Sequence, residues 1–149
     1  NTGLATGATG VNALKIAVAK VNLPMTQMVF RGVLCNWLVV MAVWMSFSAM
    51  DVMSKYICCL IPISGFVTMG FEHSIANMYF IALGMFIKGG DAATVELAAV
   101  APDKLAALTM GGYWGNIIPV TLGNMVGGIL FVAVLYYMVF SGALDEPKA

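Results

Sequence analysis

Charged residues are scarce in this sequence. Only 9% of its 149 residues are charged, in seven basic and seven acidic side chains, while 61% are hydrophobic. A soluble domain is typically about 25% charged, so the deficit indicates a protein whose solvent is lipid. Because the opposite charges cancel, the chain has no cationic face for nucleic acid, and we expect no nucleic-acid partner.

Cysteine and histidine are also rare, which limits metal and cofactor chemistry. The three cysteines lie in apolar stretches and form no CxxC pair, so we interpret them as buried small hydrophobes. A different class of function would be the membrane anchor subunit of a respiratory enzyme. Holding haem there often takes two facing histidines, and His73 is the only one. We expect no metal, no cofactor and no enzymatic activity.

Long apolar stretches dominate what remains. Three of them reach or exceed the roughly 20 residues that a helix needs to cross the hydrocarbon. They cover about residues 28–50, 56–87 and 113–140. A lead-in loop outside the membrane, residues 1–26, precedes them, and a short polar tail, residues 141–149, follows. We therefore predict an all-α integral membrane protein with three spans.

The second stretch is too long for one span and is interrupted at its centre. Gly70, Glu72 and His73 fall there, within the sequence GFEHSIANM. This pattern predicts a helix broken near residues 70–73 into two halves, roughly 57–69 and 74–88. Irregular backbone at that depth is tolerated only inside protein or against a water-filled cavity, so the break predicts a solute pathway.

The polar residues at membrane depth are candidates for that pathway. An ionisable side chain near the bilayer centre costs at least ~2.5 kcal/mol, so it faces the interior of the bundle. Histidine can exchange a proton near neutral pH, and Asn77 lies one helical turn after His73. Glu72 could instead cap the second half-helix or pair with His73. Asn36 could line the pathway or make an interhelical hydrogen bond that fixes packing.

The third stretch contains a glycine pattern that predicts close helix packing. Gly123 and Gly127 have GxxxG spacing, and Gly128 lies beside them. In lipid this spacing lets two helix backbones approach each other. The pattern does not separate packing within one protomer from packing between subunits.

Together these segments resemble the formate/nitrite transporter family, and its formate channels in particular. GFEHSIANM resembles the family signature, supported by RGVLCNWLVVMAVWMSFS in the first stretch and NIIPVTLGNMVGGILF in the third. The resemblance runs from about Lys20 to Phe140. Nine consecutive residues around a buried Glu-His pair are hard to obtain by chance.

The resemblance implies an architecture and a function. Family members have six spans in two inverted halves, an aquaporin-like fold and a homopentameric assembly with one pore per protomer. Residues 27–149 match the second half of one such channel domain, so this half alone should not conduct. The implied location is the inner cell membrane, as a multi-pass protein. The implied solute is a small monovalent anion, most of all formate, with nitrite or hydrosulfide as alternatives.

The resemblance also assigns roles to single residues. It matches His73 to the central pore histidine and Glu72 to its acidic neighbour. Phe66, otherwise ordinary core, matches an aromatic at a pore constriction. Polar residues near the histidine match Asn36 and Asn77. A lysine near the periplasmic mouth, proposed to attract the anion, matches Lys20, which would otherwise be a solvated loop charge.

Charge bias disagrees with the orientation that the family implies. On the side of the lead-in and the second connector lie five cations, Lys15, Lys20, Arg31, Lys88 and Lys104, against Lys55 and Lys148 on the other side. The positive-inside rule would place the five in the cytoplasm, whereas the family places them in the periplasm. We follow the family, because cations at the mouth of an anion channel have another explanation.

Overall fold

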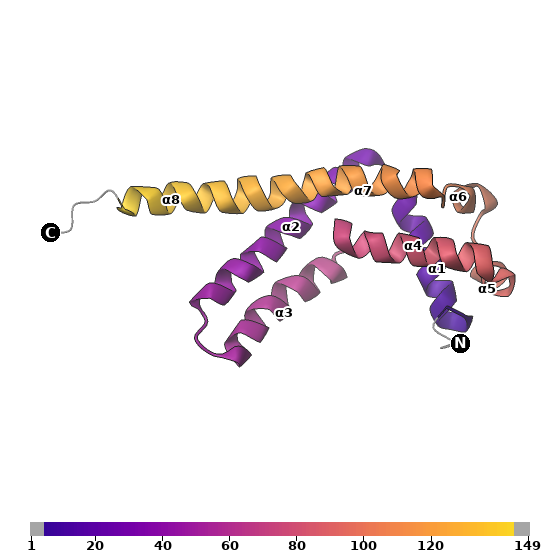
Figure 1. Ribbon diagram of the computed structural model, residues 1–149, viewed down its shortest axis with the longest axis horizontal. Helices are drawn as coiled ribbons and strands as arrows, with labels where there is room; N and C mark the ends of the chain where they lie inside the picture. Colours follow the sequence, from indigo (N-terminus) through magenta and orange to yellow (C-terminus); the bar gives the residue numbers. More distant parts are fainter. Residues whose placement is uncertain (1–4, 145–149) are drawn as a thin grey trace. The chain divides into compact units, whose positions relative to one another are not determined.

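The computed structural model describes residues 5–144, and in this part of the chain every regular element is a helix, with no strand (Figure 1). The helices are α1 (Gly7–Val21), α2 (Met25–Ser48), α3 (Val52–Thr68), α4 (Ser74–Gly90), α5 (Ala92–Ala98), α6 (Pro102–Ala106), α7 (Met110–Met125), the π-helical segment η1 (Val126–Val134) and α8 (Leu135–Leu144). Two helices, α2 and the continuous run from Met110 to Ser141, are long and apolar enough to cross a membrane. The predicted all-α class is confirmed.

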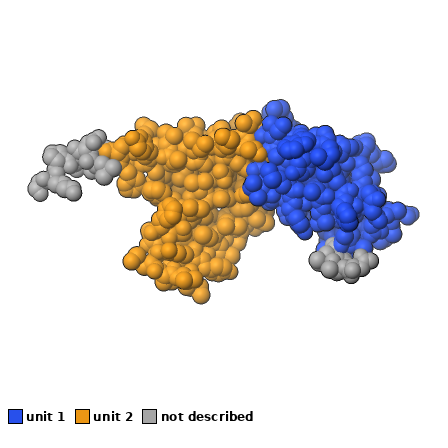
Figure 2. Space-filling model, viewed as in Figure 1, with its two compact units in different colours: residues 1–28, 74–119 blue, residues 29–73, 120–149 orange. Residues whose placement is uncertain are grey.

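The helices form two compact units, coloured separately in Figure 2. Unit 1 contains Asn1–Met28 and Ser74–Pro119, and unit 2 contains Val29–His73 and Val120–Ala149. Both α2 and α7 therefore contribute residues to both units. Each unit is described by itself.

The lead-in, predicted as a loop, contains the helix α1 and supplies much of the core of unit 1. Leu14, Ala17 and Val18 are buried and recur at the spacing of one helix face, which packs against α4. Gly84 of α4 makes this contact possible, because a Cβ there would lie 2.2 Å from Ala17 Cβ. The prediction missed this helix because a short, sparsely apolar face becomes stable only when a partner covers it.

Two polar residues order the connector between α4 and α7, which is part of unit 1. Asp91 caps α5 by accepting hydrogen bonds from the hydroxyl and the N–H of Thr94. The Lys88 ammonium donates to the carbonyls of Leu105 and Leu108, at 2.8 and 2.9 Å. The Leu105 carbonyl also accepts from the N–H of Leu108, at 3.1 Å, so the ammonium adds a second donor there and tethers the chain just after α6 to α4.

Unit 2 is built on α2, which packs along the last helical run. Trp37 stacks on Phe131 of η1, with ring centroids 4.9 Å apart, and Trp44 contacts Tyr136 of α8 at 4.8 Å. A short connector joins α2 to α3 (Figure 1). It ends at Asp51, whose carboxylate caps α3 through Ser54.

The break in the second predicted span is confirmed. Its halves, α3 and α4, begin at Val52 and Ser74, and residues 69–73 between them are not helical. The predicted tail differs from the structure, because α8 runs on to Leu144. The rest of that tail, residues 145–149, lies outside the described residues.

Candidate functional site

The break begins where Gly70 ends α3. Gly70 has a φ of +68°, in the left-handed region that glycine adopts without strain. Its N–H donates to the carbonyl of Val67, and the N–H of Phe71 donates to the carbonyl of Phe66. These two bonds form a Schellman motif, which satisfies the last carbonyls of a helix and turns the chain sharply. The turn delivers Glu72 and His73 at a defined place in unit 2.

Glu72 is held on both sides of its backbone. Its N–H donates to the carbonyl of Arg31 on α2, at 3.3 Å, and its own carbonyl accepts from the side chain of Asn124, at 2.9 Å. The residue is only 3% exposed. Since α2 and the helix bearing Asn124 both hold this backbone, the break has one fixed conformation in unit 2 rather than a free loop.

His73 lies directly before α4 and against Phe66. The two rings are stacked, with centroids 5.8 Å apart and planes inclined by 25°. Phe66 is buried at 8% exposure, while His73 is half-buried. Two residues that the sequence placed on the pathway are thus neighbours. Because α4 starts at Ser74, His73 precedes the helix and does not lie on its face with Asn77, as the spacing had suggested.

The hydrogen bond of Asn36 fits the second of its two predicted roles, an interhelical bond that fixes packing. Its amide nitrogen donates to the backbone carbonyl of Asn124, at 2.7 Å. The Asn124 amide in turn donates to the carbonyl of Gly32 on α2, at 2.8 Å. These bonds cross between α2 and the last helical run, where each satisfies a polar group that lipid could not.

Three glycines of the third stretch, Gly123, Gly127 and Gly128, face α2 within the chain. A Cβ on Gly123 would lie 2.3 Å from the carbonyl oxygen of Val29, and one on Gly127 would lie 2.1 Å from that of Val33. At Gly128 it would lie 2.7 Å from the amide nitrogen of Asn36. No real Cβ approaches so closely. These positions bring the two backbones together so that the asparagine bonds can form.

In unit 1 a second group of polar residues surrounds the end of α1. The Asn77 amide donates to the Asn116 side-chain oxygen, at 2.8 Å, and the Asn116 amide donates to the Lys20 carbonyl, at 2.9 Å. Both asparagines are fully buried. The Lys20 ammonium lies 6.0 Å from the ring centroid of Phe80. Lys20 and Asn77 are therefore brought together, through a residue that sequence reasoning had not named.

Asn116 and Asn124 were missed although a signal was present. Both are amides inside an apolar stretch, which is the argument that selected Asn36. The structure divides the predicted site residues into two groups. Unit 2 holds Phe66, Glu72, His73 and Asn36, and unit 1 holds Lys20 and Asn77.

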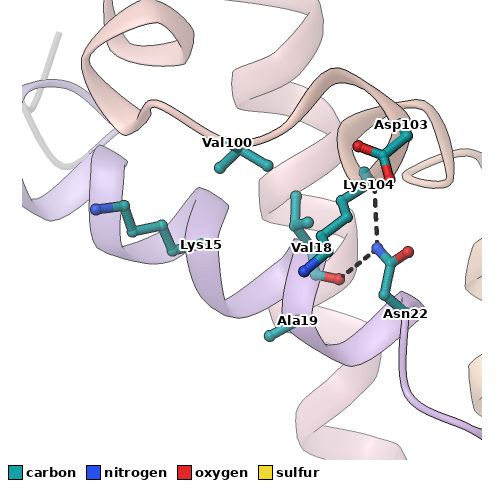
Figure 3. Close-up of a pocket in the computed structure, with 7 residues that line it drawn as sticks. All are labelled: Lys15, Val18, Ala19, Asn22, Val100, Asp103 and Lys104. Atoms are coloured by element: carbon teal, nitrogen blue, oxygen red, sulfur yellow. Dashed lines mark hydrogen bonds between the residues drawn. The ribbon is translucent and has the colours of Figure 1, made fainter.

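A pocket of about 460 Å³ opens beside α1 (Figure 3). Its lining residues are Lys15, Val18, Ala19, Asn22, Val100, Asp103 and Lys104. Asn22 donates to the carbonyls of Val18 and Lys104, at 2.8 and 3.0 Å. The pocket includes none of the predicted site residues and mixes ammonium with carboxylate groups, so it does not define an anion site. Among residues 5–144, no cluster of three or more His, Cys, Asp or Glu could hold a metal.

The chain is similar in sequence and fold to known formate channels and transporters. Formate channel FocA of Escherichia coli K12 is 39% identical over 140 residues, covering 91% of this chain and 48% of the relative. A probable formate transporter of Methanothermobacter thermautotrophicus is 40% identical over 128 residues, a match that covers 84% of this chain and 40% of the relative. A solved pentameric formate channel with formate bound superposes with a TM-score of 0.79 at 36% identity, and the match covers 89% of this chain and 53% of that channel's chain.

The chain thus spans about half the length of the curated relatives it matches. The sequence model of one family, described as Formate/nitrite transporter, matches residues 1–138. That match covers nearly the whole chain, both units included. The chain belongs to the formate/nitrite transporter family.

Proposed function

We propose that the protein conducts a small monovalent anion, formate above others, across the cell membrane. The family consists of channels and transporters that are multi-pass membrane proteins, and the relatives above are a formate channel and a probable formate transporter. The single observation that favours a pathway at the break is the stack of His73 on Phe66. A related solved channel is pentameric, so we propose a homopentamer embedded in the lipid bilayer.

The chemistry of the break suits an anion that must shed its water. A bare carboxylate pays a prohibitive cost on entering hydrocarbon unless the protein neutralises or solvates it. His73 can donate a hydrogen bond or a proton, so that a nearly neutral acid passes the apolar ring of Phe66. Alternatively, a charged imidazolium holds the anion electrostatically, while the Asn36 amide stays in its packing bond to Asn124. Glu72 has a supporting role, since its backbone is tied at both ends.

The decisive experiment measures formate flux into proteoliposomes that contain the full-length protein, at several pH values. His73→Ala and His73→Phe should change the pH dependence of flux, because they remove the group that exchanges a proton near neutral pH. Phe47→Leu serves as the control, since it changes an aromatic of α2 that is 74% exposed and leaves His73 and the ring stacked on it in place. A pH profile identical in wild type and both His73 variants would remove this residue from the mechanism.

Phe66 is proposed to act as a constriction. Phe66→Ala should widen it and admit larger carboxylates, so the ratio of acetate or lactate flux to formate flux should rise. Unaltered ratios would count against a gate at this position. Nitrite is the alternative solute, because the family description names both anions. Nitrite flux exceeding formate flux in the same vesicles would favour that alternative.

A further inference from the structure

Lys20 is held in unit 1 at both its main chain and its side chain. Asn116 of α7 donates to its backbone carbonyl, and its ammonium lies over the ring of Phe80 on α4. Asn77, one turn before Phe80 on α4, donates to the same Asn116. Three helices therefore converge on one lysine.

The Asn116 amide can have only one orientation in this arrangement. A backbone carbonyl can only accept, so the atom of Asn116 that faces Lys20 must be the nitrogen. Its oxygen therefore faces Asn77, which must present its own nitrogen in turn. The Lys20 carbonyl at the end of α1 thus determines which way both side-chain amides point. Since both asparagines are fully buried, exchanging these partners for water would need the helices to separate.

The ring of Phe80 restrains the other end of the lysine. A cation within about 6 Å of an aromatic centroid is attracted by the electron-rich face of the ring. The contact at 6.0 Å lies at that limit, and Lys20 is half-buried, so the attraction is modest. It nevertheless limits the rotamers of a long side chain that is otherwise among the most mobile.

We propose that Lys20, which the family resemblance matches to a lysine near the mouth of the pathway, captures the anion there, and that Asn116 and Phe80 are positioning residues that preorganise it. The inference deepens the proposed function and depends on it. Restricting a charged side chain before binding lowers the entropic cost of holding a small carboxylate. Preorganisation at a capture site changes the concentration at which flux half-saturates, whereas the maximal flux is set elsewhere in the pathway.

The test is formate flux against concentration in proteoliposomes of the full-length protein. Phe80→Leu keeps an apolar side chain and removes the ring face, so half-saturation should rise about 2- to 5-fold while maximal flux stays within about 2-fold. Phe80→Trp should restore the wild-type value. Phe86→Leu makes the same change on an exposed residue of α4, at 71% exposure, and should have no effect.

A second measurement separates positioning from a general structural role. In a Lys20→Met background, Phe80→Leu should raise half-saturation no further, because the cation that it positions is gone. Asn116→Ser, in which one hydroxyl cannot span both partners, should raise half-saturation in the wild-type background. Its melting temperature is measured alongside. If Asn116→Ser does not fold, the test is the comparison of Phe80→Leu in the wild-type and Lys20→Met backgrounds.

The outcomes distinguish the inference from the proposal beneath it. Wild-type flux with an unchanged half-saturation in Phe80→Leu would overturn the inference alone. So would an equal rise in the wild-type and Lys20→Met backgrounds, since the ring would then act without the lysine. A wild type that carries no formate or nitrite flux would overturn the proposed function, and the inference with it.

Discussion

Replacing Gly127 by alanine should disrupt the packing of unit 2. The added Cβ would lie 2.1 Å from the carbonyl oxygen of Val33 and 3.0 Å from its Cα. Both atoms belong to the backbone of α2, so no side-chain rotation can relieve the overlap. The backbones must separate by about 0.9 Å to restore the 3.0 Å that real Cβ contacts need.

Separating the backbones lowers the unfolding free energy, because it stretches the two asparagine hydrogen bonds between α2 and the last helical run. The bond from Asn124 to the Gly32 carbonyl would lengthen from 2.8 Å, and the bond from Asn36 to the Asn124 carbonyl from 2.7 Å, both to beyond 3.5 Å. Each is worth about 1 kcal/mol. Repacking adds about 1–3 kcal/mol, while alanine in place of glycine returns about 1 kcal/mol in a helix. We expect a net loss of about 2–4 kcal/mol.

The assay is the unfolding free energy of the full-length protein in mixed micelles, titrated with SDS. Gly115→Ala is the matched control, because it makes the same change on α7 at an exposed position with nothing within 4 Å of the added Cβ. It should be neutral or stabilising by about 0.5–1 kcal/mol. If Gly127→Ala were as stable as Gly115→Ala, the close approach of the two backbones would be wrong.

Three further predictions concern the helix ends. Gly70→Ala should lower the unfolding free energy by about 1–2 kcal/mol through its φ of +68° alone, since the space around it is open. Gly65→Ala, in the interior of α3, should leave the unfolding free energy unchanged. Equal unfolding free energies of the two variants would refute this. The hydroxyl and N–H of Ser54 hold the pKa of Asp51 below its ordinary value of 3.8. A folded-state pKa below the unfolded one stabilises at higher pH, so the advantage in melting temperature of wild type over Asp51→Asn should persist at neutral pH and disappear only below pH 3.8. An advantage that survived in strong acid would contradict the cap. Lys88→Met should speed amide hydrogen exchange in residues 102–109, because the carbonyls of Leu105 and Leu108 lose the ammonium that ties them to α4. Exchange at the wild-type rate there would show that the ammonium does not stabilise this segment.

Much of the fold could be predicted because lipid imposes strict rules on sequence. Long apolar stretches have to be helices, and polar residues at mid-depth have to face protein or water. Those rules predicted the break at Gly70 from span length and composition. They also singled out Glu72 and His73 as unusual. The glycine pattern around Gly127 predicted close packing but could not name its partner.

The helix α1 and the links through Asn116 and Asn124 could not be predicted in this way. The face of α1 is too short to be recognised without α4 against it. The bonds from Asn116 to Lys20 and from Asn124 to Gly32 join residues 96 and 92 positions apart, so their partners depend on how the helices fold back. The sequence by itself determined a membrane helix bundle with an interrupted span. Only the tertiary structure decided which backbone carbonyls the buried amides would reach, because a hydrogen bond needs its partners within about 3 Å and local sequence does not encode that proximity.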